Sequence, residues 1–454
     1  ILSQAVIADV IPPRDRGRYM GIIGGVFAFS SVAGPLIGGW ITEGPGWRWA
    51  FWLNLPLTIL SILAVIFLLP HRPFREREKH SIDYLGSLIL MAGTSALVLA
   101  TIWGGNQYEW TSSQIIGLLI FSVVAALVFI PVENRAAEPI MPMYLFKNRN
   151  FLLTLSASLA LGVAMFGAVE YIPTYLQMAL GVSATVAGLL MIPMMGVMLV
   201  VSIVTGRVVS KTGRYKRYVT TGTAVAALGL FLLSTVNVDT PTWLFCMYLA
   251  VMGAGLGMSI QFLTLIVQNA FSVSVVGTAT AANNFFRQVG ATVGASLVGG
   301  LFTSRLTSLI SERMPQQALQ SSGGHASSSL TPELVASLPE PVHSIIVNAY
   351  NDALIPLFLY LVPSALVSTL LLFFIREDAL ATTLETEPAV DIARAATGAI
   401  PVITPEMAAK DAQALKSMQG PSRRTIAESV SSEDSDEPTA SSKNSGSKDS
   451  SDRD

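Results

Sequence analysis

The chain has 454 residues, of which 51% are hydrophobic and only 13% charged, and its mean hydropathy is +0.55. Soluble proteins carry about 25% charged residues, so this composition excludes a soluble globular domain and indicates an integral membrane protein. The formal net charge of -2 gives no reason to expect a nucleic-acid partner, and the single cysteine, Cys246, excludes an internal disulfide and a metal cluster held by thiolates.

The chain begins with an apolar stretch, residues 1–9, which has neither an initiator Met nor a charged segment before it. It lacks the pattern of a signal peptide, and we interpret it as the end of a helix whose beginning is missing. Further apolar runs reach about 20 residues, the length that crosses the hydrocarbon core of a bilayer. We predict membrane spans near residues 18–42, 48–69, 83–103, 114–132, 151–176, 183–205, 217–236, 241–267, 276–304 and 352–375.

The first of these spans contains Gly34, Pro35, Gly38 and Gly39. Gly34 and Gly38 are one helical turn apart, so we expect their shared face to let a neighbouring helix approach closely. Pro35 removes a backbone donor between them and is expected to bend the helix. A bent helix with a glycine face is a candidate for a moving part.

Lysine and arginine gather in every second gap between the spans, which the positive-inside rule assigns to the cytoplasm. These residues are Arg14, Arg16 and Arg18; Arg72, Arg75, Arg77 and Lys79; Arg135, Lys147 and Arg149; and Arg207, Lys211, Arg214, Lys216 and Arg217. Two polar segments fall outside the spans. We expect a long outer loop at 306–350, with a short helix around 332–349, and a disordered cytoplasmic tail at 377–454.

The pair Gly34-Pro35 followed by Gly38-Gly39 resembles the antiporter signature of the major facilitator superfamily, found in the fifth helix of its exporters. Its surroundings resemble the fourteen-spanner drug:proton antiporters of the EmrB/QacA type, through Pro13-Arg14-Asp15-Arg16-Gly17-Arg18, Trp47-Arg48-Trp49, Asn54-Leu55-Pro56 and Trp103-Gly104-Gly105. The resemblance implies an all-α polytopic fold of two pseudo-symmetric six-helix bundles and two linker helices, with roughly the first three helices absent. On that basis residues 1–70 are the remainder of the N-terminal bundle, 71–150 the linker helices and 151–376 the C-terminal bundle.

A second resemblance concerns residues 206–214, which echo the family's cytoplasmic loop motif but have Ser210 where the family has Asp. The charge relay therefore does not carry over, although a tight turn between rocking helices still fits. We expect the cytoplasmic gating loops to use Asp9, Arg14, Arg16, Gly17, Arg18, Gly206, Gly213 and Arg214. Gly290 with Gly294 and Gly299 with Gly300 faintly repeat the glycines of the first span.

Ionisable groups inside membrane spans are costly and usually face a cavity or a partner. Glu170 is the candidate for proton coupling, because a carboxylate in a partly desolvated cavity can exchange a proton near neutral pH. Its place about 28 Å along its span also fits an interfacial residue without that role. Arg287, about 16 Å into its span, is expected to form a polar network with Asn283, Asn284 and Gln288, which is either structural or part of the transport path.

Substrate contacts are expected from aromatic, thioether and amide side chains, which suit bulky amphipathic compounds. The candidates are Phe166, Tyr171, Tyr175, Gln177, Met191, Met194 and Gln261, in a wider pool with Met165, Met195, Phe262 and Gln268, and ordinary helix packing is the alternative role for each.

We therefore expect a proton-coupled exporter of small amphipathic or cationic compounds, a monomer in the cell membrane without metal or cofactor. The alternatives are a dedicated exporter of a metabolite, lipid or self-made antibiotic, and a non-transporting scaffold or sensor. An ATP-driven pump is disfavoured because the chain has no Walker-type loop, and a zinc enzyme because His71, His80, His325 and His343 form no ligand pair.

Overall fold

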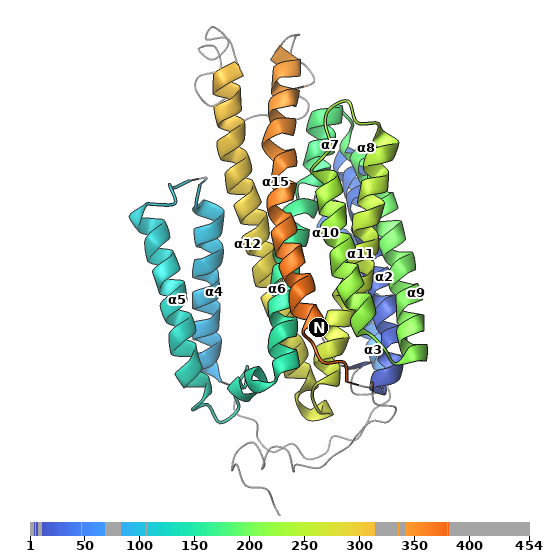
Figure 1. Ribbon diagram of the computed structural model, residues 1–454, viewed down its shortest axis with the longest axis vertical. Helices are drawn as coiled ribbons and strands as arrows, with labels where there is room; N and C mark the ends of the chain where they lie inside the picture. Colours follow the sequence, from blue (N-terminus) through green and yellow to red (C-terminus); the bar gives the residue numbers. More distant parts are fainter. Residues whose placement is uncertain are drawn as a thin grey trace, which may run out of the picture. The chain divides into compact units, whose positions relative to one another are not determined.

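The computed structural model describes residues 4, 6–7, 11–46, 48–68, 83–105, 107–313, 335, 342–378 and 380, and within them almost every residue is helical (Figure 1). The predicted spans all correspond to helices: α2 (Pro13–Glu43), α3 (Trp49–Leu68), α4 (Tyr84–Trp103), α5 (Ser113–Glu133), α6 (Arg149–Val169) with α7 (Ile172–Leu180), α8 (Ala184–Leu190) with α9 (Ile192–Thr212), α10 (Lys216–Leu233), α11 (Thr242–Asn269), α12 (Val273–Arg313) and α15 (Val342–Phe373). Eight helical stretches of the described chain are long and apolar enough to cross a membrane. The chain is an all-α polytopic membrane protein, as its composition predicts.

Short polar signals set the ends of several helices. The side chains of Asp83, Ser112, Asn148 and Ser183 accept hydrogen bonds from backbone N–H groups three residues later, at the starts of α4, α5, α6 and α8. These caps satisfy backbone donors that the first turn of a helix leaves free. At the other end of α9, Gly213 has a φ of +69°, which closes the helix as the predicted tight turn requires.

Glycines bring α6 and α12 into close contact in the second half of the chain. A Cβ atom added at Gly162 would overlap the Arg287 carbonyl, and one at Gly290 would overlap the Leu159 carbonyl. The same holds for Gly294 against Val163. The small face predicted for Gly290 and Gly294 is therefore confirmed, and it lies against α6, where it lets the two backbones approach each other.

A different glycine face joins α2 to α9. Gly17 and Gly21 of α2 lie against Ser202, Gly206 and Ser210 of α9, and an added Cβ at Gly21 would lie 2.8 Å from the Ser202 carbonyl oxygen. The expected close approach at Gly34 and Gly38 is not seen: an added Cβ at either residue meets no atom of the described chain within 4 Å. Sequence spacing shows which residues share a helix face, but it does not show where along the helix a neighbour packs. The glycine contacts with α9 are made by Gly17 and Gly21, in the first half of α2. The surroundings of Pro35 and Gly39 lie outside the part of the chain whose side chains are described.

Two predicted boundaries are wrong. The outer loop is shorter than 306–350, because α12 continues to Arg313 and α15 begins at Val342, so the ends of that segment extend the flanking helices (Figure 1). The tail does not begin as a disordered segment at 377. The Glu377 carboxylate accepts hydrogen bonds from the N–H groups of Tyr215 and Lys216, and Asp378 accepts one from Asn150. Residues 381–454 lie outside the described chain.

Candidate functional site

Five methionines line a cavity between α6, α7, α9 and α11. The cavity has a volume of about 340 Å³, and its lining is Met165, Phe166, Val169, Glu170, Pro173, Met191, Met194, Met195, Met198 and Leu256. Of the seven predicted substrate contacts, Phe166, Met191 and Met194 are therefore brought together, with Glu170 beside them. We call this the methionine cavity. Thioether side chains are flexible and polarizable, so such a lining adapts to ligands of different shape.

Glu170 lies where the helix carrying it is interrupted. The run predicted at 151–176 divides into α6 and α7 at Glu170 and Tyr171, and Pro173 follows in the first turn of α7. Proline is tolerated there because the first turn leaves its N–H groups without helical partners. The Glu170 side chain is exposed at the rim of the cavity and has no hydrogen bond or ion pair to another described residue. The only charged residue in the lining is thus an exposed carboxylate.

The second part of the site is a buried polar cluster between the first described residues, α11 and α12. The Gln4 amide donates to Gln261 Oε1 at 3.3 Å, and its own Oε1 accepts from Asn284 Nδ2 at 3.3 Å. Asn284 Oδ1 in turn accepts from the Arg287 guanidinium at 2.6 Å. Gln268 donates to the Gln4 carbonyl and to Thr280 Oγ1. The cluster therefore ties three separate parts of the sequence together inside the bundle.

The predicted Arg287 network is partly confirmed. Asn284 bonds Arg287, but Asn283 accepts from Ser158 Oγ of α6 at 2.6 Å. The Gln288 side chain is exposed and only its backbone carbonyl accepts a bond, from Thr292. Two atoms near the cluster, Gln268 Oε1 and Asn283 Nδ2, are buried without a hydrogen-bond partner in the described chain. Buried polar atoms of that kind are rare and costly, which is typical of functional positions.

Arg287 and Glu170 do not meet. Gly162 packs against the Arg287 backbone, eight residues before Glu170 in the chain, which corresponds to about 12 Å along a helix. The methionine cavity and the polar cluster consequently lie at different heights along the helices of the same bundle. α11 contributes to both, because Leu256 lines the cavity and Gln261 belongs to the cluster.

Three predicted substrate contacts have other partners. Tyr171 donates to the Ala295 carbonyl at 2.8 Å, and Gln177 donates to the Pro173 carbonyl of its own helix. Tyr175 is buried, stacks on Phe245 and donates to Asn351 Oδ1 at 2.8 Å. None of the three is part of the lining of the methionine cavity.

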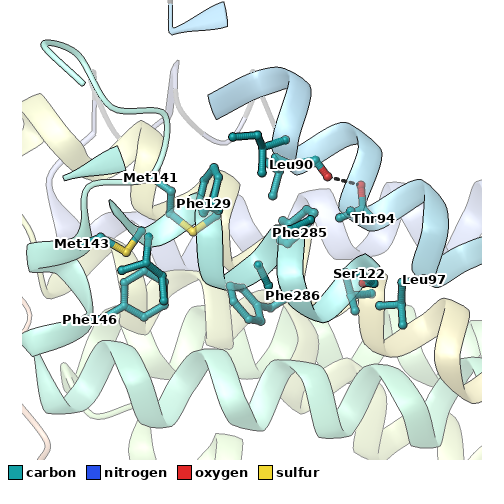
Figure 2. A pocket seen from close by; sticks show the side chains of 16 residues that line it. Leu90, Thr94, Leu97, Ser122, Phe129, Met141, Met143, Phe146, Phe285 and Phe286 are labelled. Atoms are coloured by element: carbon teal, nitrogen blue, oxygen red, sulfur yellow. Dashed lines mark hydrogen bonds between the residues drawn. The ribbon is translucent and has the colours of Figure 1, made fainter. Parts of the chain in front are cut away.

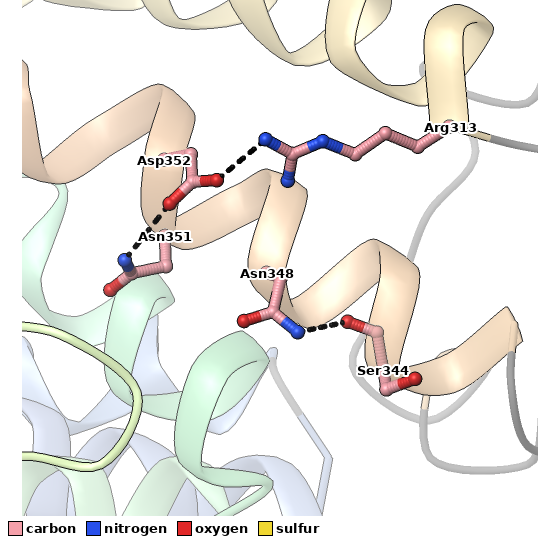
Figure 3. A network of polar contacts seen from close by, with 5 residues as sticks. All are labelled: Arg313, Ser344, Asn348, Asn351 and Asp352. Atoms are coloured by element: carbon pink, nitrogen blue, oxygen red, sulfur yellow. Dashed lines mark hydrogen bonds and ion pairs between the residues drawn. The ribbon is translucent and has the colours of Figure 1, made fainter.

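Tyr175 belongs to a polar chain that reaches the ends of α12 and α15. Figure 3 shows the Arg313 guanidinium directed at Asp352, with Asn351 beside it. The Arg313 to Asp352 ion pair measures 2.8 Å, and Asn351 Nδ2 lies 3.4 Å from Asp352 Oδ1. Asn351 therefore links the Arg313 to Asp352 ion pair to Tyr175 of α7, the helix that begins directly after the break at Glu170 and Tyr171.

Residues predicted for the gating loops come together at the start of α2 and the end of α9. Arg16 is 2% exposed and donates to the carbonyls of Ile11 at 2.8 Å and Gln268 at 3.2 Å. Gly17 packs against Gly206 of α9, whereas Arg18 and Arg214 are exposed. Asp9 lies outside the described residues, and so does the side chain of Arg14. Arg16 thus fastens the start of α2 to the end of α11, directly below the polar cluster.

Sequence reasoning missed Gln4, Ser158 and Thr280. A signal for Thr280 was available, because residues 280, 283, 284 and 287 follow the spacing of a single helix face. Gln4 gave no such signal, because its helix is represented by only a few residues. Its partners come from α11 and α12, which are distant in sequence.

The described chain thus combines membrane-length helices, an apolar cavity and a buried polar cluster in one polytopic membrane fold. The sequence profile described as Major Facilitator Superfamily matches residues 1–295. The chain belongs to this superfamily.

Two relatives of similar sequence agree with that placement. An uncharacterized MFS-type transporter of Mycobacterium tuberculosis is 40% identical over 83% of this chain and 54% of its own length. The multidrug transporter protein MdtP of Bacillus subtilis is 36% identical over 69% of this chain and 57% of its own length. The chain spans about half the length of these relatives. A crystal structure of a bacterial homolog to the human lysosomal transporter Spinster, inward-facing and occupied, is 14% identical over 82% of this chain and 91% of that one, with a TM-score of 0.39.

Proposed function

We propose that the protein exports small amphipathic or cationic compounds across the cell membrane in exchange for protons. The observation that carries the proposal is the methionine cavity with Glu170 at its rim. Methionine-rich surfaces bind varied apolar partners, and a single carboxylate adds attraction for a cation. The multidrug names of relatives such as MdtP favour the same substrate class.

In this proposal Glu170 binds a proton and the cationic substrate in alternation. Protonation removes the charge that attracts the substrate, so proton entry from outside favours substrate release on that side. The polar cluster and the contact between α2 and α9 serve as the inner gate, because they close the bundle below the cavity. Movement of packed helix bundles about such a site is the general basis of alternating access.

The α4–α5 hairpin supports membership of the fourteen-spanner drug:proton antiporter branch. Along the chain it separates α2 and α3 from the helices that begin with α6, which is where that branch has its linker helices. We further propose that the protein is monomeric and that its C-terminal tail is cytoplasmic. The domain divisions expected at residues 70, 150 and 376 belong to the same proposal.

The test is transport of a fluorescent lipophilic cation into everted membrane vesicles that contain the protein. We expect accumulation that needs an acidic vesicle interior and that is lost in Glu170→Gln, because the amide can neither exchange a proton nor attract the cation by charge. Glu109→Gln is the matched control, because Glu109 is an exposed carboxylate on the α4–α5 connection. Equal transport by both variants would remove Glu170 from the mechanism.

The same assay distinguishes the alternatives. Transport confined to one metabolite or lipid among a broad panel would indicate a dedicated exporter. Absence of proton-driven transport for every compound, with the protein folded in the membrane, would favour a scaffold or sensor.

A further inference from the structure

A second, larger cavity lies away from the methionine cavity, between the α4–α5 hairpin and α12. Figure 2 shows side chains from the hairpin, from the 3-10 helix η1 (Met143–Lys147) and from α12 directed into it. Its volume is about 450 Å³, within the range of roughly 300–1,000 Å³ that is usual for small-molecule sites. Its walls include Leu90, Leu97, Phe129, Phe146, Phe285 and Phe286.

The walls are suited to hydrocarbon alone. The lining contains no charged residue, and its two hydroxyl groups belong to Thr94 and Ser122. Thr94 Oγ1 donates to the Leu90 carbonyl of its own helix at 2.7 Å, so this donor is already used. A guest with many polar groups would lose its hydration here without gaining hydrogen bonds.

The cavity opens toward the membrane. Ala126 and Ile130 line it and are exposed, and both belong to α5, a helix long and apolar enough to span a bilayer. α5 packs mainly on α4, so its remaining faces are left to lipid. An acyl chain can therefore enter from the side without leaving hydrocarbon.

Exposed cations stand at one end of the cavity. The connection from α5 to α6 is fixed there by Glu133, a buried residue whose Oε1 accepts from the Met141 N–H at 3.0 Å. On this connection Arg135 and Lys147 are exposed, and Lys147 follows directly after a residue of the cavity wall. Basic side chains at the membrane surface attract anionic headgroups.

We propose that this cavity is a binding site for an anionic phospholipid, with an acyl chain between α4, α5 and α12 and the phosphate at Arg135 and Lys147. The lipid would fill the space between the linker hairpin and the rest of the bundle. This site is separate from the methionine cavity and does not depend on the transport mechanism.

The test is photolabelling of the protein in nanodiscs with trace amounts of a phosphatidylglycerol that carries a diazirine in one acyl chain, followed by peptide mass spectrometry. Labels on α4, α5 and residues 285–289 are compared with labels on α3, whose large side chains are nearly all exposed and which reports ordinary lipid contact. We expect clear enrichment at the cavity. Ala126→Trp should remove the enrichment, whereas Leu127→Trp, at an exposed neighbour outside the lining, should leave it unchanged.

Charge is tested in the same assay. Neutralising Arg135 and Lys147 together to Gln should lower labelling at the cavity by about thirtyfold, from the usual attraction of two surface cations to anionic lipid. The matched change at Arg207, near the end of α9, and Arg217, in the first turn of α10, should have no effect, because both are exposed cations away from the cavity. Labelling no stronger than on α3, an unaffected Ala126→Trp variant, or labelling only by a photoreactive lipophilic cation would each overturn the proposal.

Discussion

Replacing glycine by alanine at Gly21 and at Gly34 of α2 should change the stability of the protein in opposite directions. Both residues lie inside one helix, so each variant gains the same helix propensity, about 0.8–1 kcal/mol. They differ in their surroundings. A Cβ at Gly21 would lie 2.8 Å from the Ser202 carbonyl oxygen and 3.3 Å from the Ile203 Cα, whereas a Cβ at Gly34 meets no described atom within 4 Å.

The magnitude follows from this comparison. Because the Gly21 contact is with backbone, α2 and α9 must move apart, and overpacking of this kind costs about 1–3 kcal/mol. The propensity gain cancels between the two variants, so their difference equals the overpacking cost. A difference of about 2 kcal/mol corresponds to about 2 °C in melting temperature, because the unfolding entropy of about 2.1 cal/mol/K per residue is summed over a long chain, and Gly34→Ala should lie above the parent protein.

The assay is thermal unfolding of the purified variants in one detergent, followed by intrinsic fluorescence. Gly25→Ala serves as a graded control, because its nearest contact would be an ordinary 3.5 Å from the Leu199 side chain. If Gly34→Ala lowers the melting temperature as much as Gly21→Ala, the Gly34 face is packed and the reasoning is refuted. Loss of transport by a stable Gly34→Ala variant would instead support the role that the antiporter signature implies.

Three further substitutions test single contacts. Glu377→Ala removes the acceptor for two N–H groups at the start of α10 and should cost about 1 kcal/mol by chemical unfolding; an unchanged midpoint would contradict the capping role. Arg313→Gln breaks an ion pair with Asp352 whose partners are 39% and 45% exposed, so we expect less than about 1 kcal/mol, decreasing with added salt, and a larger loss would contradict the assignment as a surface pair. Arg287→Met leaves Asn284 Oδ1 without its donor and should cost about 1–3 kcal/mol in thermal unfolding, whereas full stability would show that the cluster does not depend on Arg287.

The sequence predicted the positions of the helices well, but it predicted poorly which residues of each helix pack against a neighbouring helix. Span length and composition locate each membrane helix, because crossing the bilayer sets a physical requirement on a local stretch. Helix packing has no such local requirement. The close contact of α2 is made through Gly17 and Gly21 rather than Gly34 and Gly38, since the position of α9 decides which small residues face a neighbour.

The candidate site shows the same division. Glu170, Phe166, Met191 and Met194 could be chosen by residue type, and the structure brings them to one cavity. Tyr175 could not be separated from them by type, because an aromatic ring with a hydroxyl suits both a binding site and a core. Only the arrangement of the helices shows that its hydroxyl bonds Asn351.

The most direct test of the proposed exchange is proton release by the purified protein when a lipophilic cation binds, measured with a pH indicator in weakly buffered detergent solution. We expect protons to be released on substrate addition. Glu170→Gln should release none, while Glu109→Gln should match the parent protein. Equal proton release by the Glu170→Gln variant would contradict the account.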